Sequence, residues 1–304
     1  MRVVSVLPSA TEIVCALGHA ADLVGRSAEC DYPPEVRRLP VVMRPRTLDS
    51  DRPSAEIDAR VRRARSQGES LYRLDRELLR SLRPELLLTQ DLCGVCSVTS
   101  EEVREACLQA GVSPHVVSLM PRTLEEVWAT VPTVAAALGD PEAGSRLLAT
   151  IRDRLPSPEL VSGSRPRVAV VEWVDPPILA GLWCSEMIRS AGGESIGPGP
   201  GNPGERTDWK SIGDRGADLL VISPCSFSVP RTSRELANRS LAVTIARVAP
   251  RLGTFVADEA FFSRPGPRLA EGIRLIRALL DGRPEPMPMA VERWSGASRP
   301  AVVS

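Results

Sequence analysis

The sequence predicts an α/β protein with two lobes, each built on a parallel sheet, joined by a long helical segment, with equivalent loops of the two lobes facing each other across a cleft. Three observations favour this fold class. Short apolar runs are separated by helical patterns along the chain. These runs are continuous rather than alternating, as in parallel strands that are covered on both faces. Residues 84–91 also resemble residues 217–224, so each half carries a buried strand followed by a cysteine-bearing loop.

The predicted elements start close to the N-terminus. A strand over 3–7 turns at Pro8 into a helix that begins with a capping box at Ser9–Glu12 and ends near Gly18. A short strand candidate follows at 23–25. The other strand candidates are the apolar runs at 86–89, 116–119, 168–172, 219–222 and 254–257.

The middle of the chain has a helical pattern. Thr123–Glu126 forms a second capping box, and apolar residues keep helical spacing as far as Ile151. Pro132 is expected to kink this stretch and Gly139 to interrupt it. The predicted organisation is an N-terminal α/β lobe at 1–122, a bridging helix at 123–156, a C-terminal α/β lobe at 157–281 and a tail at 282–304.

Composition describes an ordinary soluble protein and excludes two classes of partner. The 304 residues carry 38 basic and 38 acidic side chains, so no overall field favours nucleic acid or an anionic membrane surface. The apolar runs are far shorter than the roughly 18 residues of a membrane span. No export signal precedes the first strand, so we expect a cytoplasmic location. The seven cysteines are then expected to be thiols or metal ligands rather than disulfides.

Four cysteines follow predicted strands, where open α/β sheets bind their ligands. A C-x-x-C motif comes after the strand at 86–89, one cysteine follows the equivalent strand at 219–222, and one follows the candidate at 23–25. Cys184 lies in another predicted loop, and its role stays open. The candidate metal ligands are therefore Cys30, Cys93, Cys96 and Cys225.

Thiolates gathered in this way suit an iron–sulfur cluster, such as one of the 4Fe–4S type, or zinc. Zinc knuckles usually pair two C-x-x-C motifs, whereas this chain has one such motif and scattered single cysteines. The pattern therefore fits an iron–sulfur cluster better than zinc. A redox dithiol and inert structural thiols are the remaining alternatives.

Five segments, in order along the chain, form a specific combination: residues 5–13, Glu29–Pro33, Gln90–Cys93, Glu172–Trp173 and Arg264–Arg268. This combination resembles the cobalamin-binding proteins of the helical-backbone, class III group of substrate-binding proteins, which serve vitamin B12 and iron–siderophore import. The resemblance implies two Rossmann-like lobes bridged by one long helix, with the ligand between the lobes.

The chain departs from that family in its histidines. Relatives commonly carry one where Ala28 stands and another near Leu182, whereas this chain has only His19 and His115. The four candidate cysteines match the relatives, so the departure favours a cysteine-ligated centre. The predicted function is a cytoplasmic cleft protein that binds a small molecule at an iron–sulfur cluster, with a lyase or sulfur-transfer activity left open. The alternative is a cobalamin (corrinoid) or metal-chelate binding protein without catalysis.

Aromatic and anion-binding candidates lie in the same predicted loops. Three aromatic side chains would line a site for a large flat ligand, or else pack at the interface between the lobes: Tyr32, Trp173 and Trp183. Ser9 lies at a strand-to-helix turn, where it would either bind an anion or cap the helix. Arg264 would grip a phosphate or carboxylate, or anchor the helix that follows it.

Three loop carboxylates are candidates for acid–base catalysis in a closed cleft: Glu29, Asp91 and Glu172. Such carboxylates also commonly cap helices or pair with arginines. The expected partner is a small-molecule ligand or substrate, with neither nucleic acid nor membrane as a partner. The sequence makes no prediction of the oligomeric state.

Overall fold

The computed structural model describes residues 1–46, 51–91, 98–157, 164–282 and 291–295. The chain divides into two compact units, and each unit draws on separate stretches of sequence. Unit 1 comprises Met1–Asp49, Ala59–Arg154 and Arg264–Pro267, and unit 2 comprises Ser50–Asp58, Leu155–Ser263 and Arg268–Ser304.

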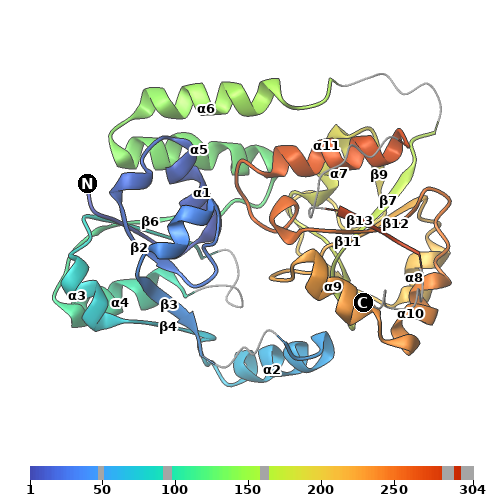
Figure 1. Cartoon of the computed structure of the whole chain (residues 1–304), viewed down its shortest axis with the longest axis horizontal. Coiled ribbons are helices and arrows are strands. Elements are labelled where there is room, and N and C mark those ends of the chain that lie inside the picture. Colours follow the sequence, from blue (N-terminus) through green and yellow to red (C-terminus); the bar gives the residue numbers. More distant parts are fainter. Residues whose placement is uncertain (47–50, 92–97, 158–163, 283–290, 296–304) are drawn as a thin grey trace, which may run out of the picture. The chain divides into compact units, whose positions relative to one another are not determined.

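Unit 1 is built on a six-stranded sheet (Figure 1). Its strands are β1 (Val3–Ser5), β2 (Leu23–Ser27), β3 (Val41–Pro45), β4 (Tyr72–Leu74), β5 (Leu86–Thr89) and β6 (His115–Ser118). Their spatial order is β4-β3-β2-β1-β5-β6, and only the edge strand β4 runs antiparallel to its neighbour. The central strands β1 and β5 are buried throughout, which explains their continuous apolar sequences.

The helices of unit 1 begin with side chains suited to helix starts. Asp75, Thr99, Thr123 and Asp140 each accept a hydrogen bond from a main-chain N–H of the first turn that follows. The elements are α1 (Pro8–Ala16), α2 (Ser54–Ser66), α3 (Arg76–Leu82), α4 (Ser100–Ala110), α5 (Leu124–Leu138), α6 (Pro141–Asp153) and the 3-10 turns η1 (Ala20–Asp22) and η2 (Pro34–Arg38).

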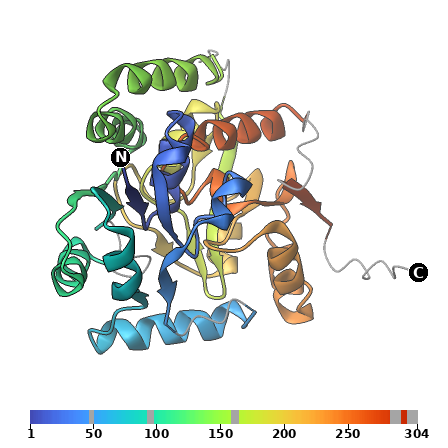
Figure 2. The same cartoon turned by 60° about the vertical axis from the view of Figure 1, so that its left-hand side comes forward.

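The helical middle of the chain is a pair of helices rather than one long helix. Gly139 ends α5 in the left-handed region at φ +80°, and α6 turns back along α5, so that both views show them side by side (Figures 1 and 2). Pro132 lies inside α5 without ending it. Gly144 of α6 allows the close approach, since an added Cβ would lie 2.6 Å from the Cβ of Ala135.

Unit 2 contains a seven-stranded mixed sheet. Its strands are β7 (Arg167–Val174), β8 (Pro177–Leu179), β9 (Glu194–Ser195), β10 (Glu205–Arg206), β11 (Leu219–Ile222), β12 (Gly253–Ala257) and β13 (Val291–Trp294). The main path is β10-β8-β7-β11-β12-β13, with β9 paired to β7. The core strands β7, β11 and β12 are parallel, whereas β8, β10 and β13 are antiparallel to their neighbours.

The helices of unit 2 lie between its strands in the sequence. They are α7 (Cys184–Ser190), α8 (Trp209–Asp214), α9 (Val229–Leu236), α10 (Arg239–Ala246), α11 (Leu269–Leu280) and the 3-10 turn η3 (Glu259–Phe261). The first residues of α2 also belong to unit 2, where the main-chain N–H and Oγ of Ser54 donate to Glu235 at 2.8 and 2.6 Å. Asp58, which is 8% exposed, accepts from Arg206 at 2.5 Å.

The structure confirms the predicted α/β fold class and its six apolar strands. Each unit has its own apolar core, formed in unit 1 around residues such as Val4 and Leu87 and in unit 2 around Val171 and Leu220. Six further strands are additions that the sequence did not indicate: β3, β4, β8, β9, β10 and β13. Within the described residues, no helix is both long and apolar enough to cross a bilayer.

Candidate functional site

The first turn of α1 follows β1 directly at the carboxyl end of the unit 1 sheet. Leu7 is the N-cap residue and makes no side-chain cap, so the predicted capping box of Ser9 and Glu12 does not form. Ser9 is 1% exposed, and its Oγ has no hydrogen-bond partner among the described residues. Buried hydroxyls are normally satisfied. The start of α1 is therefore a place where a bound molecule or water would complete the hydrogen bonding.

A buried ion network lies beside this turn. The Arg264 side chain is 13% exposed, and its Nη1 donates to Glu12 Oε1 at 3.1 Å and to Asp31 Oδ1 at 2.6 Å. Glu12 is almost wholly buried at 3%. Gly266 packs on Ser9, because an added Cβ would lie 3.3 Å from the Ser9 Cβ. The Arg264 guanidinium is thus paired with carboxylates of α1 and of the loop after β2.

Cys30 is a core thiol. It is 1% exposed, and Thr11 Oγ1 donates to its Sγ at 3.0 Å. Burial raises the pKa of Cys30 to about 11, although the Thr11 hydrogen bond opposes the shift. A metal ligand must be a thiolate, and this environment disfavours one.

The loop after β2 is held in shape by Arg26. Its Nη1 donates to three main-chain carbonyl oxygens between Ser27 and Cys30, at distances from 2.9 to 3.3 Å. Burial raises the pKa of Glu29, with Arg264 acting in the opposite direction. Tyr32 ends the loop with 46% of its surface exposed. The loop therefore presents a carboxyl that holds its proton more readily than usual and an aromatic ring at the surface.

Asp91 fixes the end of the loop that follows β5. Its carboxylate accepts hydrogen bonds from the Ser100 main-chain N–H at 2.5 Å and from Ser118 Oγ at 2.7 Å. Burial alone would raise the pKa of Asp91, but these bonds bring it below the usual value. Asp91 thus positions α4 and β6. On the same strand, Thr89 is fully buried, and its Oγ1 has no partner among the described residues.

In unit 2, an aromatic cluster lies where β7 and β11 end. The rings of Trp173 and Phe227 are 5.3 Å apart and tilted by 52°, and the Arg231 guanidinium lies 4.2 Å from the Phe227 ring centre. Trp173 is half-buried, and its Nε1–H has no acceptor among the described residues. The buried Ser223 Oγ also has none. Phe227 is buried, so Trp173 is the partly accessible ring of the pair, and this end of the sheet has unfilled hydrogen-bonding capacity.

Glu172 lies beside this cluster and is closely covered by a glycine. A Cβ on Gly204 would clash with Glu172 Oε1, so a larger residue at this position would require the Glu172 side chain to move. Gly181 similarly contacts the main chain around Pro203, where an added Cβ would lie 2.4 Å from the Pro203 carbonyl carbon. Leu182 follows in the left-handed region at φ +53°. The glycine-rich loop at 197–204 is thus packed against Glu172 and its neighbours.

Three further candidates near these loops differ in burial and in hydrogen bonding: Trp183, Cys184 and Cys225. Trp183 is 4% exposed and donates from Nε1 to the Phe262 carbonyl at 2.8 Å, which favours packing over ligand contact. Cys184 is buried, and burial with the nearby Glu172 charge raises its thiol pKa well above the ordinary range. Cys225 is half-buried, and its main-chain N–H donates to the Glu172 carbonyl at 3.0 Å.

The prediction of an iron–sulfur cluster is wrong. In the part of the chain that the structure describes, no three His, Cys, Asp or Glu residues are grouped so as to hold a metal ion, so zinc has no site there either. Cys30 belongs to unit 1 and Cys225 to unit 2, and Cys30 is buried as a thiol. Cys93 and Cys96 lie outside the described residues. The lyase or sulfur-transfer activity that the sequence analysis left open depended on such a cluster, so it no longer has support.

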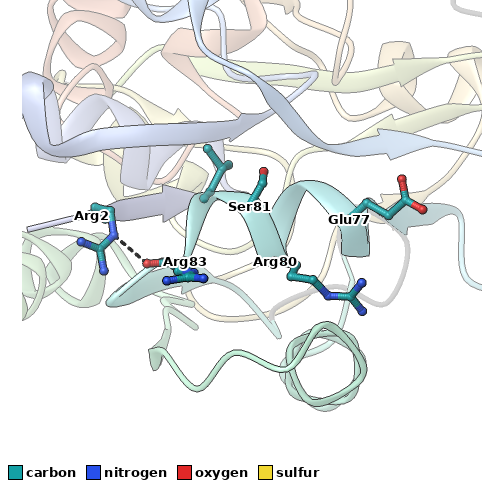
Figure 3. Close-up of a pocket in the computed structure, with 6 residues that line it drawn as sticks. Arg2, Glu77, Arg80, Ser81 and Arg83 are labelled. Atoms are coloured by element: carbon teal, nitrogen blue, oxygen red, sulfur yellow. Dashed lines mark hydrogen bonds between the residues drawn. The ribbon is translucent and has the colours of Figure 1, made fainter.

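An arginine-lined hollow of about 770 Å³ lies at the opposite end of the unit 1 strands, near the C-terminus of α3 (Figure 3). Arg2 Nε donates to the Arg83 carbonyl at 2.8 Å, and Arg80 Nε donates to the Ala110 carbonyl at 3.2 Å. Both carbonyls belong to helix C-termini, which cations stabilise. These arginines therefore act as helix caps, away from the polar loops described above.

Sequence reasoning missed several residues at the candidate site. Glu12 was treated as part of a capping box, and Thr11, Ser223 and Phe227 were not singled out. The position of Phe227, two residues after Cys225 in a strand-end loop, was the one available signal. The pairing of Glu12 with Arg264 joins residues far apart in the sequence, so no local pattern could reveal it.

Comparison with known proteins shows which solved structures share this fold. No family model and no curated protein matches the sequence. Among solved structures, a periplasmic heme-binding protein from Pseudomonas aeruginosa is 19% identical, with a TM-score of 0.71 over 98% of this chain and 99% of its own. The periplasmic heme-binding protein RhuT from Roseiflexus is 22% identical, with a TM-score of 0.64 over 92% and 98%. The periplasmic vitamin B12 binding protein BtuF of Vibrio cholerae is 19% identical, with a TM-score of 0.62 over 92% and 96%.

The chain therefore has the fold of the class III periplasmic binding proteins, as the resemblance implied. The same comparisons correct two predictions. The neighbours are described as binding heme or vitamin B12, which supports the binding-protein alternative over an iron–sulfur protein. They are also described as periplasmic, which overturns the expected cytoplasmic location.

Proposed function

We propose that this chain is a non-catalytic binding protein for a metal-containing macrocycle or metal chelate, such as a corrinoid or heme. The observation that carries the proposal is the match of the fold over nearly the full length of both chains to a heme-binding protein. The proposed location is that of its neighbours, outside the cytoplasm. The partner is accordingly a small molecule.

The strand ends of each unit support this proposal. In unit 2, the partly exposed Trp173 packs on the buried Phe227 ring, and a flat macrocycle stacks favourably on an accessible aromatic ring. In unit 1, Tyr32 exposes its ring and Ser9 leaves a buried hydroxyl without a partner among the described residues. We propose Trp173, Tyr32 and Ser9 as ligand contacts. Glu29 and Glu172 would then select for polar groups on the ligand rather than transfer protons.

Removing the Trp173 ring tests this assignment. Trp173→Ala should weaken binding of hemin or cyanocobalamin by about 10-fold to 100-fold, since a buried aromatic contact contributes roughly 1.5–3 kcal/mol. Trp173→Phe should retain most of the affinity. Absorption titrations of the ligand with each variant give the dissociation constants.

Trp294→Ala is the matched control. Trp294 is half-buried on β13, where it lies opposite Thr254 near the start of β12. It is therefore away from the carboxyl ends of the parallel strands, where Trp173 lies. Equal affinity for the wild type and Trp173→Ala, or an equal loss in Trp294→Ala, would remove Trp173 from the site. If neither ligand binds the wild-type chain, the proposed ligand class itself is refuted.

A further inference from the structure

The arginine-lined hollow of unit 1 has an excess of positive charge. Its volume is about 770 Å³, and it is lined by Arg2, Glu77, Arg80, Ser81, Leu82 and Arg83. A volume of this size is typical of sites for small molecules. Three cations and one carboxylate thus surround a space that is large enough for a small molecule, in a chain whose formal net charge is 0.

Main-chain oxygens hold two of the three guanidinium groups in place. Arg2 Nε donates to the Arg83 carbonyl at 2.8 Å. Arg80 donates to carbonyl oxygens at the end of α4, from Nε at 3.2 Å and from Nη2 at 3.5 Å. A guanidinium group has five N–H donors, so these bonds fix the orientation of each side chain and leave further donors for a ligand. The two cations are therefore preorganised, which lowers the entropy cost of binding.

Arg83 is the third cation, and its position in the helix is unusual. It ends α3 in the left-handed region at φ +45°, where α4 and α5 end with Gly111 and Gly139. A side chain disfavours this backbone conformation, whereas glycine adopts it freely. The Arg83 side chain is exposed and has neither a hydrogen bond nor an ion pair among the described residues. Ending the helix does not require this side chain, so its position indicates a second role.

The charges are unevenly distributed along the hollow. Figure 3 shows Arg2 beside Arg83 at the C-terminal end of α3, and the Glu77 carboxylate near the start of the same helix. Glu77 and Arg83 are six residues apart, a rise of about 9 Å along a helix. Glu85 accepts from the Arg2 main-chain N–H at 2.8 Å, and its carboxylate lies 3.7 Å from Arg2 Nη1. One end of the hollow is therefore cationic, and the other end carries a hydrogen-bond acceptor.

We propose that the arginine-lined hollow binds a hydroxylated phosphomonoester of the sugar phosphate class, with its phosphate on Arg2 and Arg83. Guanidinium groups bind phosphate through parallel hydrogen bonds. A dianion is favoured over a single carboxylate, because the nearby helix C-terminus opposes negative charge. Ser81 Oγ donates to the Leu78 carbonyl at 2.9 Å, so it can accept from a ligand hydroxyl, as can the Glu77 carboxylate. None of the six lining residues is aromatic, which disfavours a nucleotide base.

Isothermal titration calorimetry of the full chain with glucose-6-phosphate tests the proposal. The wild type should bind one molecule per chain, more tightly than it binds inorganic phosphate or glucose. Arg83→Gln should weaken binding by about 10-fold to 100-fold, because it removes a charge-assisted hydrogen bond. Arg83→Gly should weaken it as much without lowering the melting temperature, because glycine suits the left-handed conformation and keeps the carbonyl that accepts from Arg2.

Arg65→Gln is the matched control, because Arg65 is exposed on α2 and does not line the hollow. This variant should bind glucose-6-phosphate as the wild type does. The proposal is overturned if the wild type does not bind the sugar phosphate, if Arg83→Gly binds it as well as the wild type, or if the control loses as much affinity. Tighter binding to vesicles that contain phosphatidic acid would also overturn it, since the phosphate would then belong to a lipid headgroup.

Discussion

Arg264 shows how single residues hold the candidate site of unit 1 together. Its guanidinium joins α1 through Glu12 and the loop after β2 through Asp31. The sequence singled out Arg264 from its motif, and it could not show which of two roles the residue takes. That choice depends on Glu12, which lies more than two hundred residues earlier and becomes its partner only in the folded chain. Cys30 is a similar case, since only burial distinguishes a core thiol from a metal ligand.

Arg264→Ala should lower the free energy of unfolding by about 3–5 kcal/mol, because it leaves the Glu12 carboxylate buried without this partner. Arg251→Ala is the matched control. Arg251 is 64% exposed and pairs with Asp218, so its loss should cost less than about 1 kcal/mol. Urea unfolding measures both. Similar small losses in the two variants would show that the Arg264 network is not a buried ion pair in solution.

His19 should make stability depend on pH. Its Nδ1 lies 2.7 Å from Asp22 Oδ2 and its Nε2 lies 3.5 Å from Asp140 Oδ2. The Asp22 hydrogen bond raises the pKa of His19 above its ordinary value of 6.5. A raised folded-state pKa stabilises the protein fully below the unfolded value, and this stabilisation is lost as pH rises through the folded value. His19→Gln should remove that part of the pH profile in urea unfolding, and an unchanged profile would contradict the assignment.

At the scale of elements, the sequence indicated long and continuous features best. Strands such as β5 and β11 were predicted at their observed bounds, because parallel strands buried on both faces require unbroken apolar runs. The two-residue strands β9 and β10 have too few residues for any pattern. β13 is half-exposed and forms only by pairing with β12, so its sequence resembles a loop. The pairing of α5 with α6 likewise depends on how Gly139 and Gly144 bring the helices together.

Gly144→Ala tests the contact between α5 and α6. The new Cβ would lie 2.6 Å from the Ala135 Cβ and 3.3 Å from the Pro132 Cα, so we expect a loss of about 1–3 kcal/mol in stability. Gly213→Ala in α8 is the control, because its Cβ would meet Val248 at an ordinary 3.6 Å. That change should be neutral or stabilise by up to about 1 kcal/mol. Thermal unfolding would contradict the packing if Gly144→Ala behaved like Gly213→Ala.

At the scale of the whole molecule, the sequence was sufficient to predict the fold. It was not sufficient to predict the kind of ligand site. Five motif segments spread along the chain sufficed for the fold class, and two of them, residues 5–13 and Glu29–Pro33, directly follow or end strands of unit 1. The cysteine spacing suggested a cluster, but spacing carries no information on burial or on which unit holds each thiol. Cys30 and Cys225 are in different units, and the described residues contain no grouped metal ligands. The packing of Trp173 on Phe227 became visible only once β7 and β11 were side by side.

The most direct test is an absorption titration of the purified wild-type chain with hemin and with cyanocobalamin, paired with the iron and acid-labile sulfide content of an anaerobic preparation. A non-catalytic binding protein should bind at least one of the two ligands saturably, with a fixed number per chain, and should contain no stoichiometric sulfide. If neither ligand binds, and iron and sulfide are present in stoichiometric amounts, the binding-protein account is contradicted.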